Sequence, residues 1–186
     1  MVRAFIAISI DSKTIERIAD VVSQLKPRMP GVRWVAKGNL HFTLKFLGQI
    51  DDLRIEPIGR ALELAVRPFP RFTINAKGLG VFPNVKRPQV LWVGLEGRDV
   101  VSLASRVECA LEPLGFRPEE RDFKPHLTVG RWRHFEGPRA RLREEIEKWK
   151  SYEFGQSKVE EVTLFESVLK PEGAVYHSLK SVALVG

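Results

Sequence analysis

His41-Phe42-Thr43-Leu44 and His126-Leu127-Thr128-Val129 are two copies of one four-residue pattern, each inside an apolar run that is typical of a β-strand. Side chains alternate between the two faces of a strand, so each His shares a face with its Thr, while the second and fourth residues point to the other face. With four His and five Thr in 186 residues, chance gives only about 0.1 His-x-Thr pairs. We therefore interpret the two copies as halves of one site.

The bulk composition fits a globular protein that can bury a core of its own. The chain has 186 residues, of which 44% are hydrophobic and 28% are charged, and no apolar run is long enough to cross a bilayer. Residues 2–10 lack the features of a signal peptide. We therefore expect a cytoplasmic protein without membrane association, built as one domain or as two small lobes packed together.

Cys109 is the only cysteine, which excludes an intramolecular disulfide and a cysteine metal cluster. It falls opposite the apolar stripe of a predicted helix, and neither a base nor a motif for a nucleophilic thiol is visible nearby. We interpret it as an incidental thiol.

The formal net charge is +7, from 30 Lys and Arg against 23 Asp and Glu. Such an excess favours polyanionic partners, with nucleic acid the first candidate and an acidic membrane surface the second, although it also serves simple solubility.

Apolar periodicity and breaker residues predict a mixture of helices and strands. Helices are expected over residues 13–26, from 51 to the prolines at 68 and 70, over 100–113, and from Pro138; strands are expected over 2–10, 32–35, 40–47, 72–82, 89–95, 126–133, 159–169 and 174–184. Hairpins outnumber βαβ units in this order, which favours an α/β fold of the α+β type, rich in antiparallel sheet. The two His lie about half the chain apart, so we expect two similar lobes, each with one His-x-Thr motif, and a cleft between them.

Two imidazoles on opposite walls of a cleft can act as base and acid in one turnover near pH 7. In-line displacement at phosphorus needs such a pair, and a Thr hydroxyl beside each His can donate a hydrogen bond to a non-bridging phosphate oxygen. Zinc-ligand spacing, a Gly-x-Ser-x-Gly elbow, a P-loop and a dinucleotide fingerprint are all missing from the sequence. The pattern therefore predicts acid-base catalysis without a metal or other cofactor.

With these motifs and their surroundings, the sequence resembles the two-histidine (2H) phosphoesterase superfamily, and within it the RNA 2',3'-cyclic phosphodiesterase branch, also called 2'-5' RNA ligase. The resemblance covers nearly the whole chain and rests on residues 3–8, 40–48, 80–83, 91–94, 123–131, 164–167 and 175–176. No motif of the family is missing.

The resemblance implies a bilobal α/β fold and hydrolysis of RNA 2',3'-cyclic phosphate ends to 2'-phosphomonoesters, with reversible 2'-5' ligation as a side activity. It implies that His41 donates a proton to the departing 3'-oxygen, that His126 accepts one from water, and that Thr43 and Thr128 bind the phosphate. Chemistry alone leaves the two histidines interchangeable. The expected partner is RNA with a cyclic phosphate end, tRNA halves included, and the expected state is a monomer.

Two further residues are candidate substrate contacts. Arg131 could neutralise phosphate, but strand parity puts it on the face opposite His126 unless the strand bulges, and a structural ion pair is the alternative. Phe82 could stack on a base or belong to the core. Lys86 and Arg87, at the tip of a predicted hairpin, suit either backbone phosphates or plain solvation, while His134 and His177 lack the Thr and are expected on the surface.

Two alternatives stay open at this point. The chain could hold RNA 3'-ends in a basic cleft without chemistry, or it could carry out the same chemistry on a small nucleotide cyclic phosphate. An intact His and Thr in both copies favours catalysis, because a pure binder would do as well with Lys or Arg.

Overall fold

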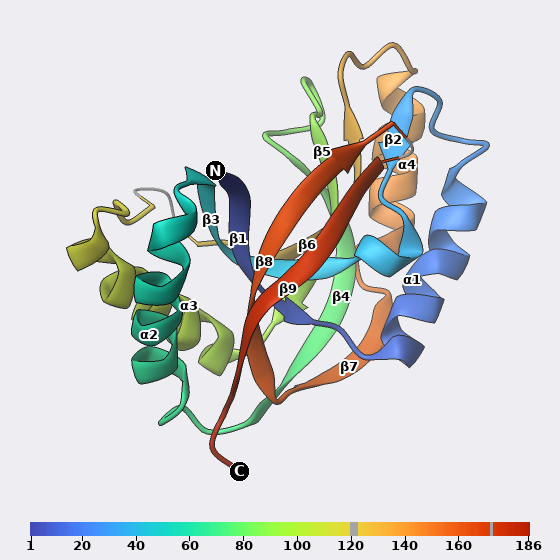
Figure 1. Cartoon of the computed structure of the whole chain (residues 1–186). Helices are drawn as coiled ribbons and strands as arrows, with labels where there is room; N and C mark the ends of the chain where they lie inside the picture. Colours follow the sequence, from blue (N-terminus) through green and yellow to red (C-terminus); the bar gives the residue numbers. More distant parts are fainter. Residues whose placement is uncertain (120–122, 172) are drawn as a thin grey trace.

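Two antiparallel β-sheets stand side by side, with helices packed on their outer sides (Figure 1). The computed structural model describes residues 1–119, 123–171 and 173–186. The helices are α1 (Ser12–Leu25), α2 (Ile55–Val66), α3 (Arg98–Leu111) and α4 (Arg139–Trp149), with short 3-10 turns at Lys37–Asn39, Asp52–Arg54 and Glu112–Leu114. The strands are β1 (Val2–Ser9), β2 (Val32–Trp34), β3 (His41–Ile50), β4 (Phe72–Phe82), β5 (Val90–Glu96), β6 (His126–Trp132), β7 (Glu153–Val159), β8 (Glu161–Lys170) and β9 (Gly173–Ala183).

The strand order is β3-β1-β8-β9 in the first sheet and β2-β6-β5-β4-β7 in the second. Helices α2 and α3 pack on each other and on the first sheet, whereas α1 and α4 pack on the second. Figure 1 shows these as two groups of helices on opposite sides of the molecule. The predicted mixed fold with two antiparallel sheets is confirmed, and the two motif strands, β3 and β6, belong to different sheets.

The chain alternates between the two sheets instead of completing one before the other. Strand β1 lies in the first sheet, but the next helix, α1, packs against β7 of the second. The chain then returns to the first sheet for β3 and α2 and leaves it again for β4 and β5. Each sheet is therefore assembled from both halves of the sequence, and the sheets cannot be separated by cutting the chain once.

The element boundaries differ from the sequence prediction in three places. Strand β7 was not predicted, because its apolar alternation is interrupted by Gly155, at φ +135°, and by the buried polar side chain of Ser157. Strand β3 does not end at Gly48 but continues to Ile50. The helix expected from Asp51 begins as a 3-10 turn, with the Asp51 carboxylate accepting from the Leu53 amide, and becomes α-helical at Ile55.

Each motif strand places the second and fourth residues of its motif in the core, as the alternation predicts. The side chains of Phe42, Leu44, Leu127 and Val129 are at most 4% exposed. Burial of side chains of this size contributes about 1.5–3 kcal/mol each. The opposite face of each strand is therefore free to carry the polar residues of the motif.

A buried ion pair fastens α3 to the first motif strand. Lys45 of β3 is only 8% exposed, and its ammonium group contacts the Glu108 carboxylate of α3. The same ammonium group donates a hydrogen bond of 2.6 Å to the Arg117 carbonyl oxygen. Two partners therefore satisfy the charge, which would otherwise be costly in this position.

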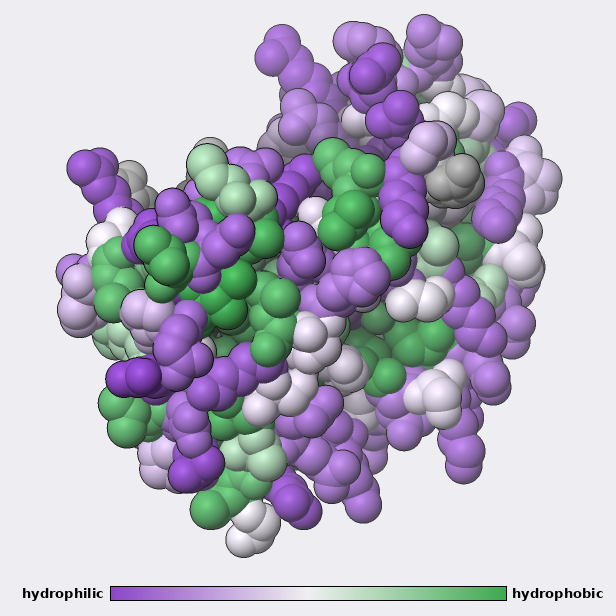
Figure 2. Space-filling view, in the orientation of Figure 1, coloured by the Kyte–Doolittle hydropathy of each residue, from purple (hydrophilic) through white to green (hydrophobic). Residues whose placement is uncertain are grey.

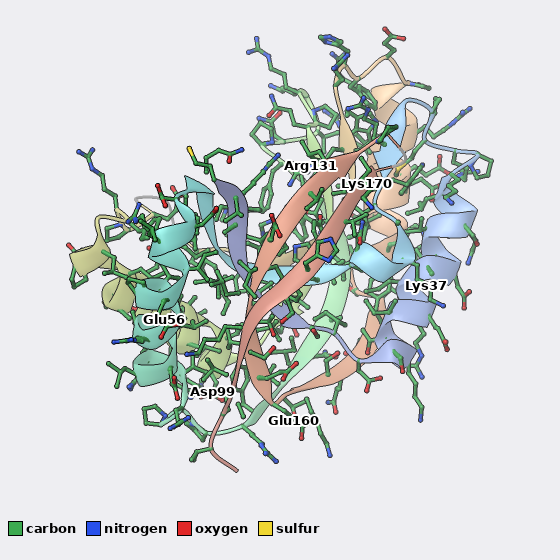
Figure 3. The ribbon with its side chains drawn as sticks, in the orientation of Figure 1. Lys37, Glu56, Asp99, Arg131, Glu160 and Lys170 are labelled. Atoms are coloured by element: carbon green, nitrogen blue, oxygen red, sulfur yellow. The ribbon has the colours of Figure 1, made fainter. Side chains whose placement is uncertain are left out.

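Glu108→Ala is expected to lower the free energy of unfolding by about 3 kcal/mol, because it leaves the Lys45 charge buried without its counter-ion. Chemical denaturation with fluorescence detection measures the change. The control is Glu56→Ala, on the outer side of α2 (Figure 3), which removes an exposed i,i+4 pair with Arg60 and should leave the midpoint unchanged. Equal effects of the two substitutions would contradict this role for Lys45.

Candidate active site

The two motif histidines are held by the same local hydrogen bond. His41 Nδ1 lies 2.7 Å from the Asn39 carbonyl oxygen, and His126 Nδ1 lies 2.7 Å from the Lys124 carbonyl oxygen. A carbonyl oxygen only accepts, so Nδ1 must carry the hydrogen in both rings. In the neutral form, Nε2 of each imidazole is then the atom that can accept a proton.

Aromatic rings surround each imidazole. The His41 ring lies 4.8 Å from the Phe5 ring and 5.1 Å, edge-on, from the Tyr176 ring. The His126 ring lies 4.9 Å, edge-on, from the Phe82 ring and 6.5 Å from the Trp92 ring. Each histidine is thus half-buried against apolar surface, with part of its side chain left accessible.

Burial lowers the pKa of both histidines below the ordinary value of 6.5, because a partly dry environment disfavours the imidazolium ion. The backbone hydrogen bond at Nδ1 opposes this effect in both rings. The positive charge of Arg131 lowers the pKa of His126 further. The lowered pKa values favour the neutral form of both imidazoles in the free protein.

Thr43 and Thr128 share the partly exposed face with their histidines, as the alternation predicts. Both are half-buried, and neither hydroxyl is bonded to another described residue. Strands β3 and β6 approach each other between the two sheets. Two hydroxyl donors therefore accompany the two imidazoles in this region.

Each motif strand contains a bulge at the fourth residue of its motif. Consecutive residues of β1, Ile6 and Ala7, pair with Lys45 and Thr43, so Leu44 has no partner on β1. In the second sheet, Leu91 and Trp92 of β5 pair with Gly130 and Thr128, which leaves out Val129. An unpaired residue reverses the alternation of the side chains that follow it.

The bulge at Val129 places Arg131 on the face of His126 and Thr128. Beyond the bulge, Gly130 and Trp132 are buried and Arg131 is exposed. Parity in a regular strand would put Arg131 on the opposite face, and the bulge is the exception that the sequence analysis allowed. The structural ion pair is not found, since Arg131 has no carboxylate partner among the described residues.

The positive charge of Arg131 acts on residues of both sheets. Its charge acts on His126 and also on Tyr176 of β9, whose ring contacts His41. In Figure 3, Arg131 is labelled in the upper part of the molecule. Arg131 therefore connects a residue of the second sheet with the His41 side of the first.

Three residues near His41 were missed by the functional interpretation of the sequence. Phe5 and Tyr176 form its aromatic surroundings. The Asn39 side chain donates a 2.7 Å hydrogen bond to the Ala174 carbonyl oxygen and so fixes the turn whose own carbonyl holds the imidazole. Phe5 and Tyr176 lie in stretches that carry the family resemblance, which was the available signal; nothing marked Asn39.

The other candidate residues differ in how far they are exposed. Phe82 is half-buried and contacts both Trp92, at 5.0 Å between ring centroids, and His126. Lys86 and Arg87 are exposed at the loop tip, where both backbone amides donate to the Asn84 side chain. His134 and His177 are exposed, as predicted.

Within residues 1–119, 123–171 and 173–186, no three His, Cys, Asp or Glu side chains gather closely enough to hold a metal ion. In the same ranges, no helix has the length and apolarity needed to cross a membrane. The face of the molecule in Figure 2 carries hydrophilic and hydrophobic residues side by side.

The two sheets, with a His-x-Thr motif on one strand of each, define a phosphoesterase of the two-histidine class. The chain matches the family model described as LigT-like phosphoesterase over residues 8–92 and 95–176, and it belongs to that family.

Relatives with curated names are similar over nearly their full length. The chain is 35% identical over 178 residues to a Methanocaldococcus jannaschii protein named RNA 2',3'-cyclic phosphodiesterase, covering 96% of this chain and 98% of that one. It is 37% identical over 182 residues to a protein of the same name from Methanothermobacter thermautotrophicus, with 96% and 97% coverage.

Solved structures share the fold. The protein TT0787 of Thermus thermophilus superimposes with a TM-score of 0.82 at 26% identity, covering 97% of both chains. Escherichia coli LigT complexed with 3'-AMP superimposes with a TM-score of 0.79 at 25% identity, covering 100% of this chain and 99% of LigT.

Arg131→Gln is expected to raise the pKa of His126, because it removes a positive charge that disfavours the imidazolium ion. Titration of the imidazole resonances by NMR measures the change, and His41 serves as an internal reference because Arg131 is not among the groups that shift its pKa. Arg133→Gln removes the same charge outside the strand and should leave His126 unchanged. An unchanged pKa of His126 in Arg131→Gln would contradict the electrostatic interaction between Arg131 and His126.

Proposed function

We propose that the protein hydrolyses 2',3'-cyclic phosphate ends of RNA to 2'-phosphomonoesters by acid-base catalysis between His41 and His126, without a metal ion. The observation that carries the proposal is the matched geometry of the two histidines. Each lies on the partly exposed face of its strand, each is held at Nδ1 by a backbone carbonyl that leaves Nε2 for the substrate, and each has a Thr hydroxyl on the same face.

In the proposed reaction, His126 takes a proton from water as the water oxygen bonds to phosphorus. The bond from phosphorus to the 3'-oxygen breaks, and protonated His41 gives its proton to that oxygen. The products are a 2'-phosphomonoester and a free 3'-hydroxyl, and the two imidazoles end with exchanged protonation states. The assignment of His41 as donor and His126 as acceptor comes from the family resemblance.

The remaining residues stabilise the phosphate in this proposal. The hydroxyls of Thr43 and Thr128 donate hydrogen bonds to non-bridging oxygens, which gain negative charge during displacement. Arg131, on the same face as His126 and without a carboxylate partner in the described part of the chain, adds a positive charge. Phe82 packs on Trp92 and beside His126, where it helps to hold the His126 ring in place.

The names of the relatives support RNA with a 2',3'-cyclic phosphate end as the substrate. The two archaeal relatives are named RNA 2',3'-cyclic phosphodiesterases, and Escherichia coli LigT was crystallised with a nucleoside monophosphate. The same displacement with an RNA 5'-hydroxyl in place of water would join two RNAs through a 2'-5' bond, and we propose this ligation as a reversible side activity.

The kind of RNA, the domain organisation, the oligomeric state and the location of the protein are proposed from its sequence. The net charge of +7 supports an RNA substrate over a small uncharged ester, and tRNA halves are one such RNA. We propose that the chain acts as one two-lobed domain with one His-x-Thr-x (HXTX) motif per lobe, as a monomer in the cytoplasm.

His41→Ala and His126→Ala are each expected to lower turnover by roughly 10²- to 10⁴-fold, because each removes one general acid or base. The assay incubates an oligonucleotide bearing a 2',3'-cyclic phosphate with the protein in EDTA and identifies which hydroxyl retains the phosphate. His134→Ala and His177→Ala are the controls, since both residues are exposed and lie outside the motifs.

Three outcomes would contradict parts of this proposal. Loss of activity in EDTA would point to a metal. A 3'-phosphate product would show that the 2'-oxygen, and not the 3'-oxygen, is the leaving group. Persistence of the cyclic phosphate together with RNA binding that falls steeply with salt would make the protein a binder of RNA 3'-ends.

The pH profile of kcat/KM is expected to be bell-shaped with its maximum below pH 6.5. This profile reports the free enzyme, one histidine must be protonated and the other neutral, and burial lowers the pKa of both below 6.5. Initial rates measured across the acidic and neutral range, at substrate concentrations below KM, give the profile. A maximum on the alkaline side of neutrality would show that the imidazoles are not the titrating pair.

A further inference from the structure

Arg33 stands directly opposite Arg131 on the neighbouring strand. Strand β2 is the edge of the second sheet, and its register with β6 pairs these two residues. Residues that are directly opposite in an antiparallel pair point to the same face, with Cβ atoms about 5 Å apart. Arg33 therefore lies on the face that carries His126, Thr128 and Arg131, one strand farther from His126.

The neighbours of Arg33 in β2 agree with this direction. Val32 and Trp34 are half-buried and pack against the core, and a Cβ atom added at Gly130 would meet both side chains. Arg33, between them, is exposed. The short strand thus has an apolar side that packs inward and a side that presents one guanidinium group to solvent.

Two arginines in this register repel each other. Like charges directly opposite one another destabilise a sheet, and neither Arg33 nor Arg131 forms an ion pair with another described residue. A charge on an edge strand does hinder pairing with another chain. An acidic residue at position 33 would protect the edge equally well and would also pair with Arg131. Protection of the edge therefore does not explain a second arginine.

The loops beside this pair are basic as well. Residues 83–90 and 131–139 together contain five Lys or Arg and a single acidic residue, Glu136. The Arg139 side chain donates a 3.1 Å hydrogen bond to the Lys86 carbonyl oxygen and so joins the two loops. A surface of one charge attracts ligands of the opposite charge, so this end of the second sheet suits a polyanion.

Two arginines on adjacent strands can contact two separate phosphates of one ligand. The planar guanidinium group matches a phosphate with two parallel hydrogen bonds. In the proposed reaction, Arg131 faces the cyclic phosphate at the end of the RNA. The next phosphate along that RNA is the diester on the 5' side of the terminal nucleotide, and a mononucleoside 2',3'-cyclic phosphate lacks it.

We propose that Arg33 binds this penultimate phosphodiester and thereby makes the protein prefer RNA ends to mononucleoside 2',3'-cyclic phosphates. The inference rests on the proposed function for the position of the cyclic phosphate. Contact with a backbone phosphate carries no sequence information, so the preference is for the presence of a preceding nucleotide and not for its base.

The first test compares a trinucleotide bearing a 2',3'-cyclic phosphate with the corresponding nucleoside 2',3'-cyclic phosphate. Arg33→Gln is expected to lower kcat/KM for the trinucleotide by about 10-fold and to change that for the nucleoside by less than about twofold. Arg33→Lys retains the charge and should retain most of the activity on the trinucleotide. Arg98→Gln, which removes an exposed arginine at the start of α3, is the control and should change neither value.

An uncharged methylphosphonate in place of the penultimate phosphodiester locates the contact. With this trinucleotide, the unaltered protein should fall to the kcat/KM of Arg33→Gln, and Arg33→Gln should show no further loss. A full additional loss in the variant would overturn the inference, because Arg33 would then act elsewhere. An equal loss on the trinucleotide and the nucleoside in Arg33→Gln would also overturn it, because Arg33 would then support the site around His126.

A binding measurement keeps the inference separate from the proposed reaction. Fluorescence anisotropy follows a labelled trinucleotide with a 2'-phosphate end as the salt concentration is raised. One phosphate contact fewer should reduce the slope of log Kd against log salt concentration by about 0.7 in Arg33→Gln. An unchanged slope would overturn the inference, whereas a reduced slope on a protein that does not hydrolyse RNA would uphold it and refute only the proposed reaction.

Discussion

A bulge at the fourth residue of each motif decides which side chains face the region between the sheets. Leu44 and Val129 both fall outside the ladder with the neighbouring strand, at the same position of the two motifs. Each bulge keeps two apolar residues of the motif in the core and then reverses the alternation, so that the next outward side chain is Phe46 on one strand and Arg131 on the other. The two walls are therefore alike at their His and Thr and different just beyond: one is aromatic and the other is cationic.

The electrostatics of the site follow from its packing. Phe5 and Tyr176 on one side, and Phe82 and Trp92 on the other, remove part of the water from each imidazole, which lowers both pKa values. The backbone carbonyls at Nδ1 fix the tautomer and leave Nε2 of each neutral imidazole as the proton acceptor. The positive charge of Arg131 acts on His126, and a bound phosphate anion would favour the protonated form of either histidine.

The path of the chain makes the site depend on the whole fold. Because the chain alternates between the sheets, Asn39, which holds His41, is itself fixed by a carbonyl of β9 near the end of the sequence. Lys45 on β3 is fixed through Glu108 of α3 and the Arg117 carbonyl, in the segment that leads to the second motif. The first motif strand is thus held by residues that are distant in sequence, and the two histidines are positioned by one cooperative structure.

The sequence by itself determined the two motifs, the pairing of each His with its Thr, the burial of Phe42 and Leu127, most helices and strands, and the mixed fold, because these depend on local periodicity and residue type. It could not determine strand β7, the direction of Arg131, the exposure of Phe46 or the rings around His41. Whether a strand residue is left unpaired depends on its register with a neighbour brought from elsewhere in the chain, and the aromatic contacts join β1, β3 and β9. Only the tertiary structure brings those strands together, so only it decided what surrounds the two histidines.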